Sequence, residues 1–334
     1  MALGAIPCRR GVVDDSRASF AKCHNMKRRS VDSEGLWKES RMITSLDCVP
    51  CFARQALDAA RAASADPLLH ERILRDVLRM IAAGDLNQPP PALAQRMHRH
   101  LRDLTGVKDP YRAEKDHSNH LALELLPDLS ARISTAADPF ELAVRFAAAG
   151  NIIDLAAKTG ISECDIKSAI ESAVTEPFVG DLSSFHAATA AASSILYLTD
   201  NAGEIVFDRL LIEQLPAGRV TVVVRGAPVI NDATKADAEA AGLDQIAEII
   251  DNGSDAPGTV LEDCSTEFRK RFESADVIIA KGQGNYETLS NTHRSIFFLL
   301  KIKCPVVALR TGIAVGTQAL IHIGPEGGTG QSGE

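Results

Sequence analysis

Apolar residues recur at three- and four-residue spacing through the first half of the chain, from about residue 50 to residue 178. This spacing is typical of amphipathic α-helices, and Pro, Gly or Asp-Pro pairs separate the segments. The segments are residues 52–64, 68–84, 91–106, 113–134 and 138–160. The pattern therefore predicts an N-terminal all-helical domain of five or six helices.

From about Ser193 the pattern changes to short runs rich in β-branched residues, separated by stretches with helical spacing. Runs that are apolar on both faces are typical of a parallel sheet covered by helices on both sides. We predict strands at residues 194–199, 220–224, 247–250, 276–280 and 305–309. The expected fold class is α/β, with a Rossmann-like, mostly parallel sheet flanked by helices.

Both ends of the chain differ from the two central parts. Residues 1–41 mix charged and small residues without periodicity, and they lack the apolar segment of a secretory signal. We expect a disordered tail there, or sequence upstream of a true start at Met42. The expected division is then a helical domain at 42–185, an α/β domain at 186–320 and a flexible Gly-rich tail at 321–334.

The composition limits the kinds of binding partner that we expect. The 334 residues carry a net charge of -8 and no apolar run long enough to span a membrane, so we expect neither nucleic acid nor membrane as a partner. The seven cysteines are an odd number spread along the chain, unlike a secreted disulfide framework. We expect a reducing, cytoplasmic setting.

Polar residues follow each predicted strand. The carboxyl ends of parallel strands meet at one edge of a sheet, where open α/β sheets bind ligands. An acid–amide pair such as Asp200-Asn201 also makes an ordinary turn or helix cap, but five polar ends at one edge favour a site. The five are Asp200-Asn201, Arg225-Gly226, residues 251–254, residues 281–285 and residues 310–312.

The residue types at this edge indicate a metal and an anion. Asp200, Asn201 and Asp232 supply hard oxygen ligands, which suit Mg²⁺ or Mn²⁺ better than a thiolate-preferring metal. Asp232 could also cap the helix expected after it. Lys281 is followed by glycines, a combination that places a cation and backbone N–H groups around an anion. Together these groups predict a small phosphorylated substrate and phosphoryl transfer, which depends mainly on positioning and charge neutralisation.

Several segments resemble the damage-control metal-dependent phosphatases, once classed as the domain of unknown function 89 family. The resemblance covers roughly Met42 to Gly316 and fits the compact prokaryotic branch with an N-terminal Cys-x-x-Cys. It is carried by "DCVPCFARQALDAAR", "DPYRAEKDHSN", "AAAGNIID", "YLTDNAGEIVFDRLLIEQL", "VVVRGAPVINDATKADAEAAGL", "DNGSDAPGT", "ADVIIAKGQGNYETL" and "FFLLKIKCPVVA".

The resemblance implies a phosphatase that removes phosphate from sugar phosphates or phosphopantetheine-like compounds in metabolite damage control. By motif, Asp200, Asn201 and Asp232 would bind a divalent ion (Mn, Mg, Co or Ni), and Lys281 would bind phosphate. These four residues form the expected catalytic set. Either a metal-activated water or Asp200 itself would attack phosphorus.

Further residues are candidates for phosphate or substrate binding. They are Arg225, Gly226, Ser254, Gly282 and Asn285 from the strand ends, and Asn151 and Asp154 from the helical part, where a capping role is the alternative.

Cys48 and Cys51 could bind a second metal or support redox chemistry, but no second Cys-x-x-Cys completes a zinc site, and Cys304 could join them only through tertiary packing. Buried, unreactive thiols are the simpler interpretation. His98 lies in a charged helical segment and is expected at the surface.

Two other functions remain open from the sequence. One is an S-adenosylmethionine-dependent carboxyl methyltransferase, an activity proposed for relatives of this family. The other is a non-catalytic module that binds a nucleotide or phosphometabolite. The segment "KGQGN" lacks the third glycine and the acid of a dinucleotide site, which weakens the nucleotide interpretation.

Overall fold

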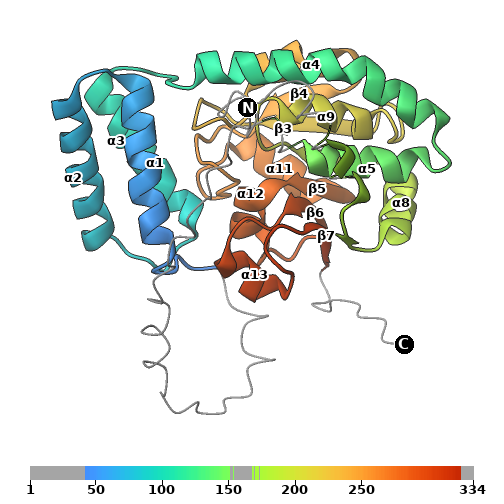
Figure 1. Ribbon diagram of the computed structural model, residues 1–334. Helices are drawn as coiled ribbons and strands as arrows, with labels where there is room; N and C mark the ends of the chain where they lie inside the picture. Colours follow the sequence, from blue (N-terminus) through green and yellow to red (C-terminus); the bar gives the residue numbers. More distant parts are fainter. Residues whose placement is uncertain (1–41, 151–152, 154–167, 169, 173, 325–334) are drawn as a thin grey trace, which may run out of the picture. The chain divides into compact units, whose positions relative to one another are not determined.

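The computed structural model describes residues 42–150, 153, 168, 170–172 and 174–324. Three helices open this range and lie side by side (Figure 1). They are α1 (Cys48–Ala63), α2 (Pro67–Ala83) and α3 (Pro90–Thr105). Proline stands in the first turn of α2 and α3. Backbone N–H groups in a first turn have no acceptor within the helix, so the missing N–H of proline costs no hydrogen bond there. Phe52, Ile73 and Leu101 belong to a hydrophobic core that these helices form among themselves.

The rest of the described chain is built around a seven-stranded sheet in the order β1-β7-β6-β5-β2-β3-β4. All neighbouring pairs are parallel except β6 and β7. The strands are β1 (Phe178–Val179), β2 (Ile195–Leu198), β3 (Val220–Val224), β4 (Glu248–Asp251), β5 (Val277–Lys281), β6 (Ile296–Lys301) and β7 (Gln318–Ile323). The expected mostly parallel α/β sheet is confirmed.

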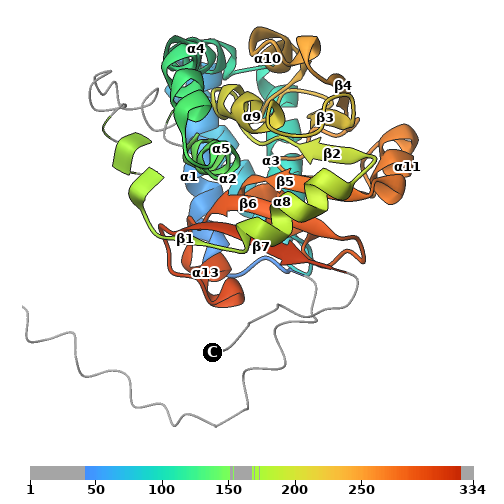
Figure 2. The ribbon, with the colours of Figure 1, turned by 90° about the vertical axis from the view of Figure 1, so that its right-hand side faces the viewer.

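Helices cover both faces of the sheet, and side chains alternate between two cores along each central strand. In β2, Ile195 and Tyr197 join one core while Leu196 and Leu198 join the other. The first core contains residues of α4 (Arg112–Thr135), α5 (Pro139–Ala149), α8 (Leu182–Ala191), α9 (Glu204–Ile212) and α10 (Lys235–Ala240), followed by the 3₁₀ turn η2 (Leu243–Gln245). The second contains residues of α11 (Thr266–Ser274), α12 (Gly282–Leu289) and α13 (Pro305–Thr311). Figure 2 shows α4, α5 and α9 together on one side of the sheet.

The strand predicted at 305–309 is wrong, because this segment forms helix α13. Pro305 stands in the first turn of the helix, where it fits well, and Gly312 ends it with φ 71°. The strand of this region is β6, which lies just before it. Residues 310–312 therefore do not follow a strand and do not join the polar edge; Arg310 donates to Asn291 instead.

The C-terminal part also differs from the expectation. β7 continues to Ile323 and runs antiparallel to β6, so the expected flexible tail cannot begin at residue 321. The expected tail at 1–41 lies outside the described residues. The boundary near residue 185 stays a prediction, although α4 and α5 share a core with the sheet.

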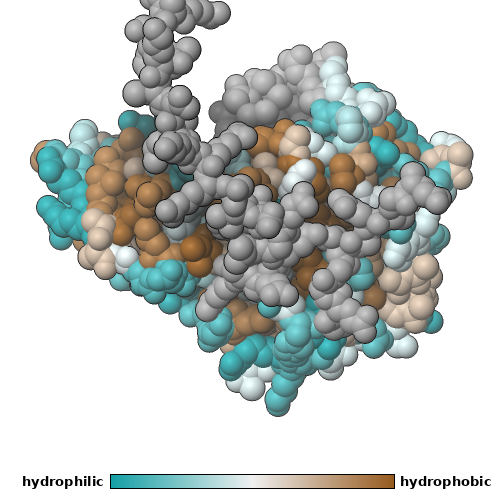
Figure 3. All heavy atoms as spheres, turned by 90° about the horizontal axis from the view of Figure 1, so that it is seen from below, coloured by the Kyte–Doolittle hydropathy of each residue, from teal (hydrophilic) through white to brown (hydrophobic). Residues whose placement is uncertain are grey.

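None of the helices in the described part of the chain is long and apolar enough to cross a bilayer. Seen from below, apolar patches alternate with hydrophilic residues (Figure 3). Exposed large apolar side chains include Ile43, Leu46 and Leu309.

Candidate active site

The Asp200-Asn201 pair lies between the end of β2 and the start of α9. Gly203 makes the turn with φ 75°, a conformation that favours glycine. A Cβ on Gly203 would lie 2.7 Å from the Ile153 side chain and 2.9 Å from that of Ser118. The tight packing of this turn fixes the direction in which Asp200 and Asn201 project.

A short backbone bridge joins this turn to the loop after β3. Asn201 and Asp232 form an isolated antiparallel β-bridge. The Ala202 N–H donates to Asn231 O at 2.8 Å, and the Ala233 N–H donates to Asp200 O at 2.8 Å. Two segments that are thirty residues apart in sequence are therefore held edge to edge, as the sequence pattern predicts for the ends of parallel strands.

The three expected metal ligands are buried and lie together. Asp200, Asn201 and Asp232 are 7%, 6% and 4% exposed. Asn201 Nδ2 donates to Asp200 Oδ2 at 2.9 Å, and Arg225 Nε donates to Asp232 Oδ2 at 2.6 Å. Hydrogen bonds among the described residues thus engage one oxygen of each carboxylate.

Arg225 has one N–H donor, on Nη2, that lies near Asp200 but makes no hydrogen bond to a described residue. Its Nη1 donates to Thr259 Oγ1 at 3.4 Å and to Asn285 Oδ1 at 3.3 Å. Its buried Nη2 has no hydrogen-bond partner among the described residues and lies 3.9 Å from Asp200 Oδ1. A buried guanidinium N–H is costly to leave unpaired, and an anion beside this atom would satisfy it.

The positive charges near Asp200 and Asp232 do not offset the cost of burying these two carboxylates. Burial, together with the negative charges of Glu204 and Asp232, raises the pKa of Asp200 to about 8, although the positive charges of Lys303 and Arg225 oppose this. Burial also raises the pKa of Asp232, although Arg225 acts in the opposite direction. Two buried acids in this condition would be stabilised by a cation between them.

The donor set fits a divalent metal ion. Two carboxylates and an amide oxygen are ligands that Mg²⁺ and Mn²⁺ accept. The described residues hold no group of three or more His, Cys, Asp or Glu side chains arranged for a metal, but this set needs only two acids because Asn201 supplies the third oxygen. The start of α12 comes so close that a Cβ on Gly282 would lie 1.9 Å from Asp200 Oδ2.

Lys281 is buried next to the expected ligands and does not face solvent. Its side chain is fully buried, and Nζ donates to Asp208 Oδ1 at 2.5 Å, Glu204 Oε1 at 2.7 Å and Ala147 O at 2.9 Å. Burial lowers the pKa of Lys281, but the two carboxylates outweigh this and raise it above its usual value. All three ammonium protons are engaged by the protein, so the expected contact with phosphate stays a prediction.

Asn285 and Gly226 connect the loops at the ends of neighbouring strands. Asn285 Nδ2 donates to Thr199 O and Lys281 O, and its Oδ1 accepts from Thr259. A Cβ on Gly226 would lie 2.5 Å from the Gly253 backbone, so only glycine allows these two loops to meet. Both residues lie at the polar edge, and the contacts described here give them a structural role.

Ser254 is engaged at the boundary with α3. Its Oγ donates to Asp263 Oδ2 at 2.7 Å and accepts from Gln95 Nε2 at 3.3 Å. Arg99 and Arg102 of the same helix pair with Asp255. Helix α3 is thereby held against the loop that follows β4.

The segment "DPYRAEKDHSN" has a positioning role that the sequence did not indicate. Asn119 Oδ1 accepts from the Gly203 N–H at 2.7 Å, and its Nδ2 donates to Asp237 Oδ1 at 3.0 Å. Lys115, fully buried, pairs with Asp237 Oδ2 at 2.9 Å. Helix α4 therefore holds the Asp200 turn and the start of α10, next to Asp232, in one network.

Two residues near the ligands are absent from the sequence-based set. Glu204 accepts from Asn201 and from Lys281. Lys303 is exposed, and its positive charge acts on Asp200, Glu204 and Asp232, opposing the rise that burial causes in the pKa of both aspartates. It is a cation with access to solvent at the site, and only its place in "FFLLKIKCPVVA" could have indicated it.

The remaining candidates are less informative. Asn151 and Asp154 lie outside the described residues. Cys48, Cys51 and Cys304 are free thiols. Burial, with smaller contributions from Glu287, Cys304 and Cys51, raises the pKa of Cys48 to about 11, although a backbone hydrogen bond at Ser45 opposes this. Cys304 therefore lies near the pair, but within the described ranges these thiols form no metal-holding group.

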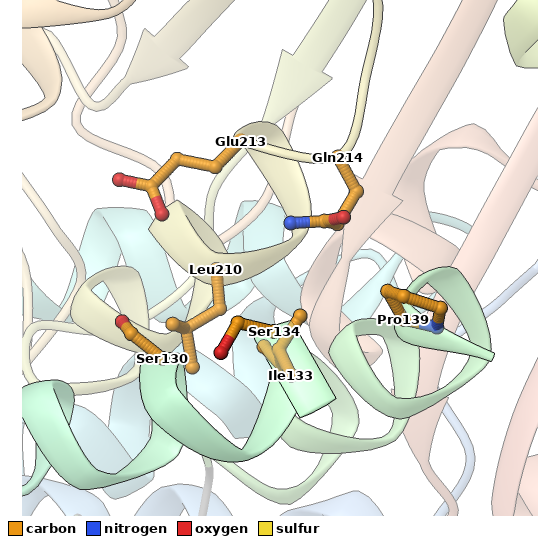
Figure 4. Close-up of a pocket in the computed structure, with 7 residues that line it drawn as sticks. All are labelled: Ser130, Ile133, Ser134, Pro139, Leu210, Glu213 and Gln214. Carbon is orange, nitrogen blue, oxygen red and sulfur yellow. The ribbon is translucent and has the colours of Figure 1, made fainter. Parts of the chain in front are cut away.

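A shallow hollow on another part of the surface has no such chemistry. Figure 4 shows the side chains that line it, which come from α4, the start of α5, and α9 with the residues just after it. Its volume is about 210 Å³. Its lining is Ser130, Ile133, Ser134, Pro139, Leu210, Glu213 and Gln214, with Glu213 as its single charged side chain. The polar edge of the sheet remains the stronger candidate for a catalytic site.

The fold and this edge define a class: a Rossmann-like α/β protein with acids, an amide and a guanidinium group gathered at the carboxyl ends of its central strands. Residues 44–319 match the family model described as the damage-control phosphatase ARMT1-like domain. The chain belongs to this family, and the resemblance seen in its motifs is confirmed. Its placement in the branch with the N-terminal Cys-x-x-Cys stays a prediction.

Relatives from archaea agree with this assignment. A damage-control phosphatase of Archaeoglobus fulgidus is 35% identical over 80% of this chain and 95% of the relative. A damage-control phosphatase of Pyrococcus horikoshii is 34% identical, covering 82% and 96%. The crystal structure of a DUF89 family protein from Pyrococcus horikoshii matches with a TM-score of 0.78 and 33% identity, over 84% of this chain and 99% of that one.

Proposed function

We propose that this protein is a divalent-metal-dependent phosphatase that hydrolyses small phosphorylated metabolites, such as sugar phosphates or phosphopantetheine-like compounds, in metabolite damage control. Two relatives named damage-control phosphatases support the reaction class. The observation that carries the proposal is the buried group of Asp200, Asn201 and Asp232 beside the unpartnered Nη2 of Arg225. We place the reaction in the cytoplasm, which the free cysteines favour.

Asp200, Asn201 and Asp232 would hold Mn²⁺, Mg²⁺, Co²⁺ or Ni²⁺. When bound, such an ion polarises a phosphoryl oxygen and makes a bound water more acidic. Arg225 Nη2 binds the phosphate and offsets charge on the transferring group, and the exposed ammonium of Lys303 adds to this. The backbone at Gly282, which opens α12 beside Asp200, brings the positive end of that helix to the same place.

The site leaves two routes for attack on phosphorus. A water held near Asp200 would give phosphate directly. Asp200 itself, as a nucleophile, would leave an acyl phosphate on the enzyme, which water then hydrolyses. Mass spectrometry of acid-quenched protein separates the two, because only the second route adds a phosphoryl group to the peptide that contains residue 200.

The test is phosphate release from sugar phosphates, phosphopantetheine derivatives and p-nitrophenyl phosphate, using chelated protein resupplied with each of the four ions. We expect turnover that needs metal and disappears in Asp200→Asn, because one ligand loses its charge. Asp244→Asn, at an exposed position, is the matched control and should keep full activity. Metal-independent turnover, or an active Asp200→Asn, would refute the proposal; tight binding of S-adenosylmethionine without turnover would favour a methyltransferase.

A further inference from the structure

The side-chain amide of Asn201 has both of its N–H groups directed at carboxylates. Nδ2 donates to Asp200 Oδ2 at 2.9 Å and to Glu204 Oε2 at 3.1 Å. An amide nitrogen carries two protons and its oxygen points the opposite way. With both N–H groups engaged by acids, Oδ1 is the side-chain atom of Asn201 that is left to bind a cation.

Glu204 is itself held in place. Its Oε1 accepts from Lys281 Nζ at 2.7 Å, so the two carboxylate oxygens have different and fixed partners. Lys281 is anchored in turn by Asp208 and by Ala147 O, and Asp208 accepts from the Tyr197 hydroxyl at 2.9 Å. A carboxylate with one oxygen on an ammonium and the other on an amide has no freedom to exchange them.

Packing confines the stem of Glu204 as well. Glu204 is the first residue of α9 and is 4% exposed. A Cβ on Gly150, at the end of α5, would lie 3.0 Å from Glu204 Cγ. The close approach of the end of α5 restricts the positions that the Glu204 side chain can take.

We propose that Glu204 is a positioning residue that sets the orientation of the Asn201 amide, so that Oδ1 rather than Nδ2 faces the cation. Lys281 acts by holding Glu204 in this arrangement, rather than by contacting phosphate. This inference rests on the metal site of the proposed function. An amide turned the other way would present N–H groups to the ion and remove one of three ligands.

Glu204→Gln tests the inference with little change in size. Lys281 requires an acceptor, so the new amide would direct its NH₂ at Asn201 Nδ2, and Asn201 would turn its oxygen toward residue 204. We expect the Kd for Mn²⁺, measured on metal-free protein by calorimetry or electron paramagnetic resonance, to rise about 10- to 100-fold, the range usual for a lost partner of a metal ligand. Glu213→Gln, at the exposed residue that caps the end of the same helix, should leave the Kd unchanged.

A double variant separates positioning from a general structural effect. In Glu204→Gln combined with Asn201→Asp, residue 201 accepts from the new amide and keeps an oxygen toward the cation, at the same net charge. We expect this variant to bind Mn²⁺ more tightly than Glu204→Gln, and more tightly than Asn201→Asp alone, in which two carboxylates face each other. The second comparison needs no folded Glu204→Gln protein.

Each outcome decides the matter. Weaker Mn²⁺ binding in Glu204→Gln with recovery in the double variant supports the inference. Unchanged binding in Glu204→Gln, or a double variant no tighter than Asn201→Asp, overturns it while leaving the phosphatase proposal in place. Wild-type protein that binds no Mn²⁺ and releases no phosphate overturns both.

Discussion

Arg225 uses its donors unequally. Nε is committed to Asp232, while Nη2 is buried without a partner among the described residues. In Arg225→Lys a single ammonium would have to bind both Asp232 and the phosphate. A planar guanidinium binds the two with separate N–H groups. We expect kcat/KM to fall about 10- to 100-fold, since a charge-assisted hydrogen bond is worth about 1.5–3 kcal/mol.

The measurement for Arg225→Lys is steady-state kinetics together with inhibition by inorganic phosphate, which should weaken in parallel. Arg269→Lys, at an exposed position, is the control and should behave as wild type. Unchanged phosphate inhibition in Arg225→Lys would show that Arg225 does not contact the anion.

His98 predicts an acid sensitivity of the fold. It is 3% exposed, and burial, together with the neighbouring positive charge of Arg102, lowers its pKa from 6.5 to about 4, with Asp255 opposing. Between pH 6.5 and 4 the unfolded chain therefore binds a proton that the folded protein does not. The contribution of His98 to the free energy of unfolding is highest above pH 6.5 and falls by about 3 kcal/mol on the way to pH 4.

His98→Leu should remove this dependence, because the side chain no longer titrates and His98 Nε2 has no hydrogen-bond partner among the described residues to lose. Urea unfolding at pH 7.5, 6 and 5 measures it. We expect the stability difference between variant and wild type to shift in favour of the variant as the pH falls. A constant difference would contradict the assignment.

Residue types at strand ends were enough to predict which polar side chains meet at the sheet edge, but not what surrounds them. Asp200, Asn201 and Asp232 meet as the pattern indicates, because parallel strands end at one edge. The engagement of Lys281 depends on α5, α9 and β5 meeting, which no local pattern encodes. The expectation that His98 lies at the surface is wrong. The sequence of a charged helical segment does not show whether its polar side faces solvent or a charged partner such as Asp255.

At the scale of elements, α3 and the loop after β4 are joined by charge. Asp255 Oδ1 accepts from Gln95 at 2.7 Å, and both Arg99 and Arg102 pair with its carboxylate. Burial raises the pKa of Asp255, but hydrogen bonds from Arg99 and Gln95 outweigh this and lower it. Asp255→Ala would leave these donors without their shared acceptor.

We expect Asp255→Ala to lower the free energy of unfolding by about 1–3 kcal/mol, and to increase amide hydrogen exchange in α3 more than in α9. Asp103→Ala, an exposed acid on α3, is the matched control. Equal exchange in α3 for Asp255→Ala and wild type would mean that other contacts hold this helix.

Element type was harder to predict near the C-terminus than elsewhere. The runs at β2, β3 and β5 are apolar and β-branched, and each is a strand as expected. "PVVAL" has the same composition, but a proline in a first helical turn and Gly312 beyond it favour α13, while "IFFLLK" next to it forms β6. A short apolar run does not specify helix or strand by itself.

At the scale of the whole molecule, the site lies where the strand order reverses. From β2 the chain moves outward to β3 and β4, then returns to β5 on the other side of β2. The expected ligands come from loops after β2 and β3, so only the folded chain brings them together. The antiparallel β7 and the core shared by α4, α5 and the sheet were not predictable from periodicity, which gives element type but not neighbours.

A ligand that binds only the folded protein stabilises it. We expect Mn²⁺ added to chelated protein at 100 times its Kd to stabilise the fold by about 2.7 kcal/mol. Thermal unfolding with and without the ion measures this, and Asp200→Asn should lose the shift. An equal shift in Asp200→Asn would place the ion elsewhere.

The contrast between the two lysines near the site has a consequence for chemical labelling. Lys281 is fully buried with its ammonium bound on three sides, whereas Lys303 is exposed. An amine-acylating reagent should therefore modify Lys303 quickly and leave Lys281 intact until the chain unfolds. Peptide mapping of labelled protein would report Lys281 as a marker of the intact fold, and protection of Lys303 by inorganic phosphate as a marker of an occupied site.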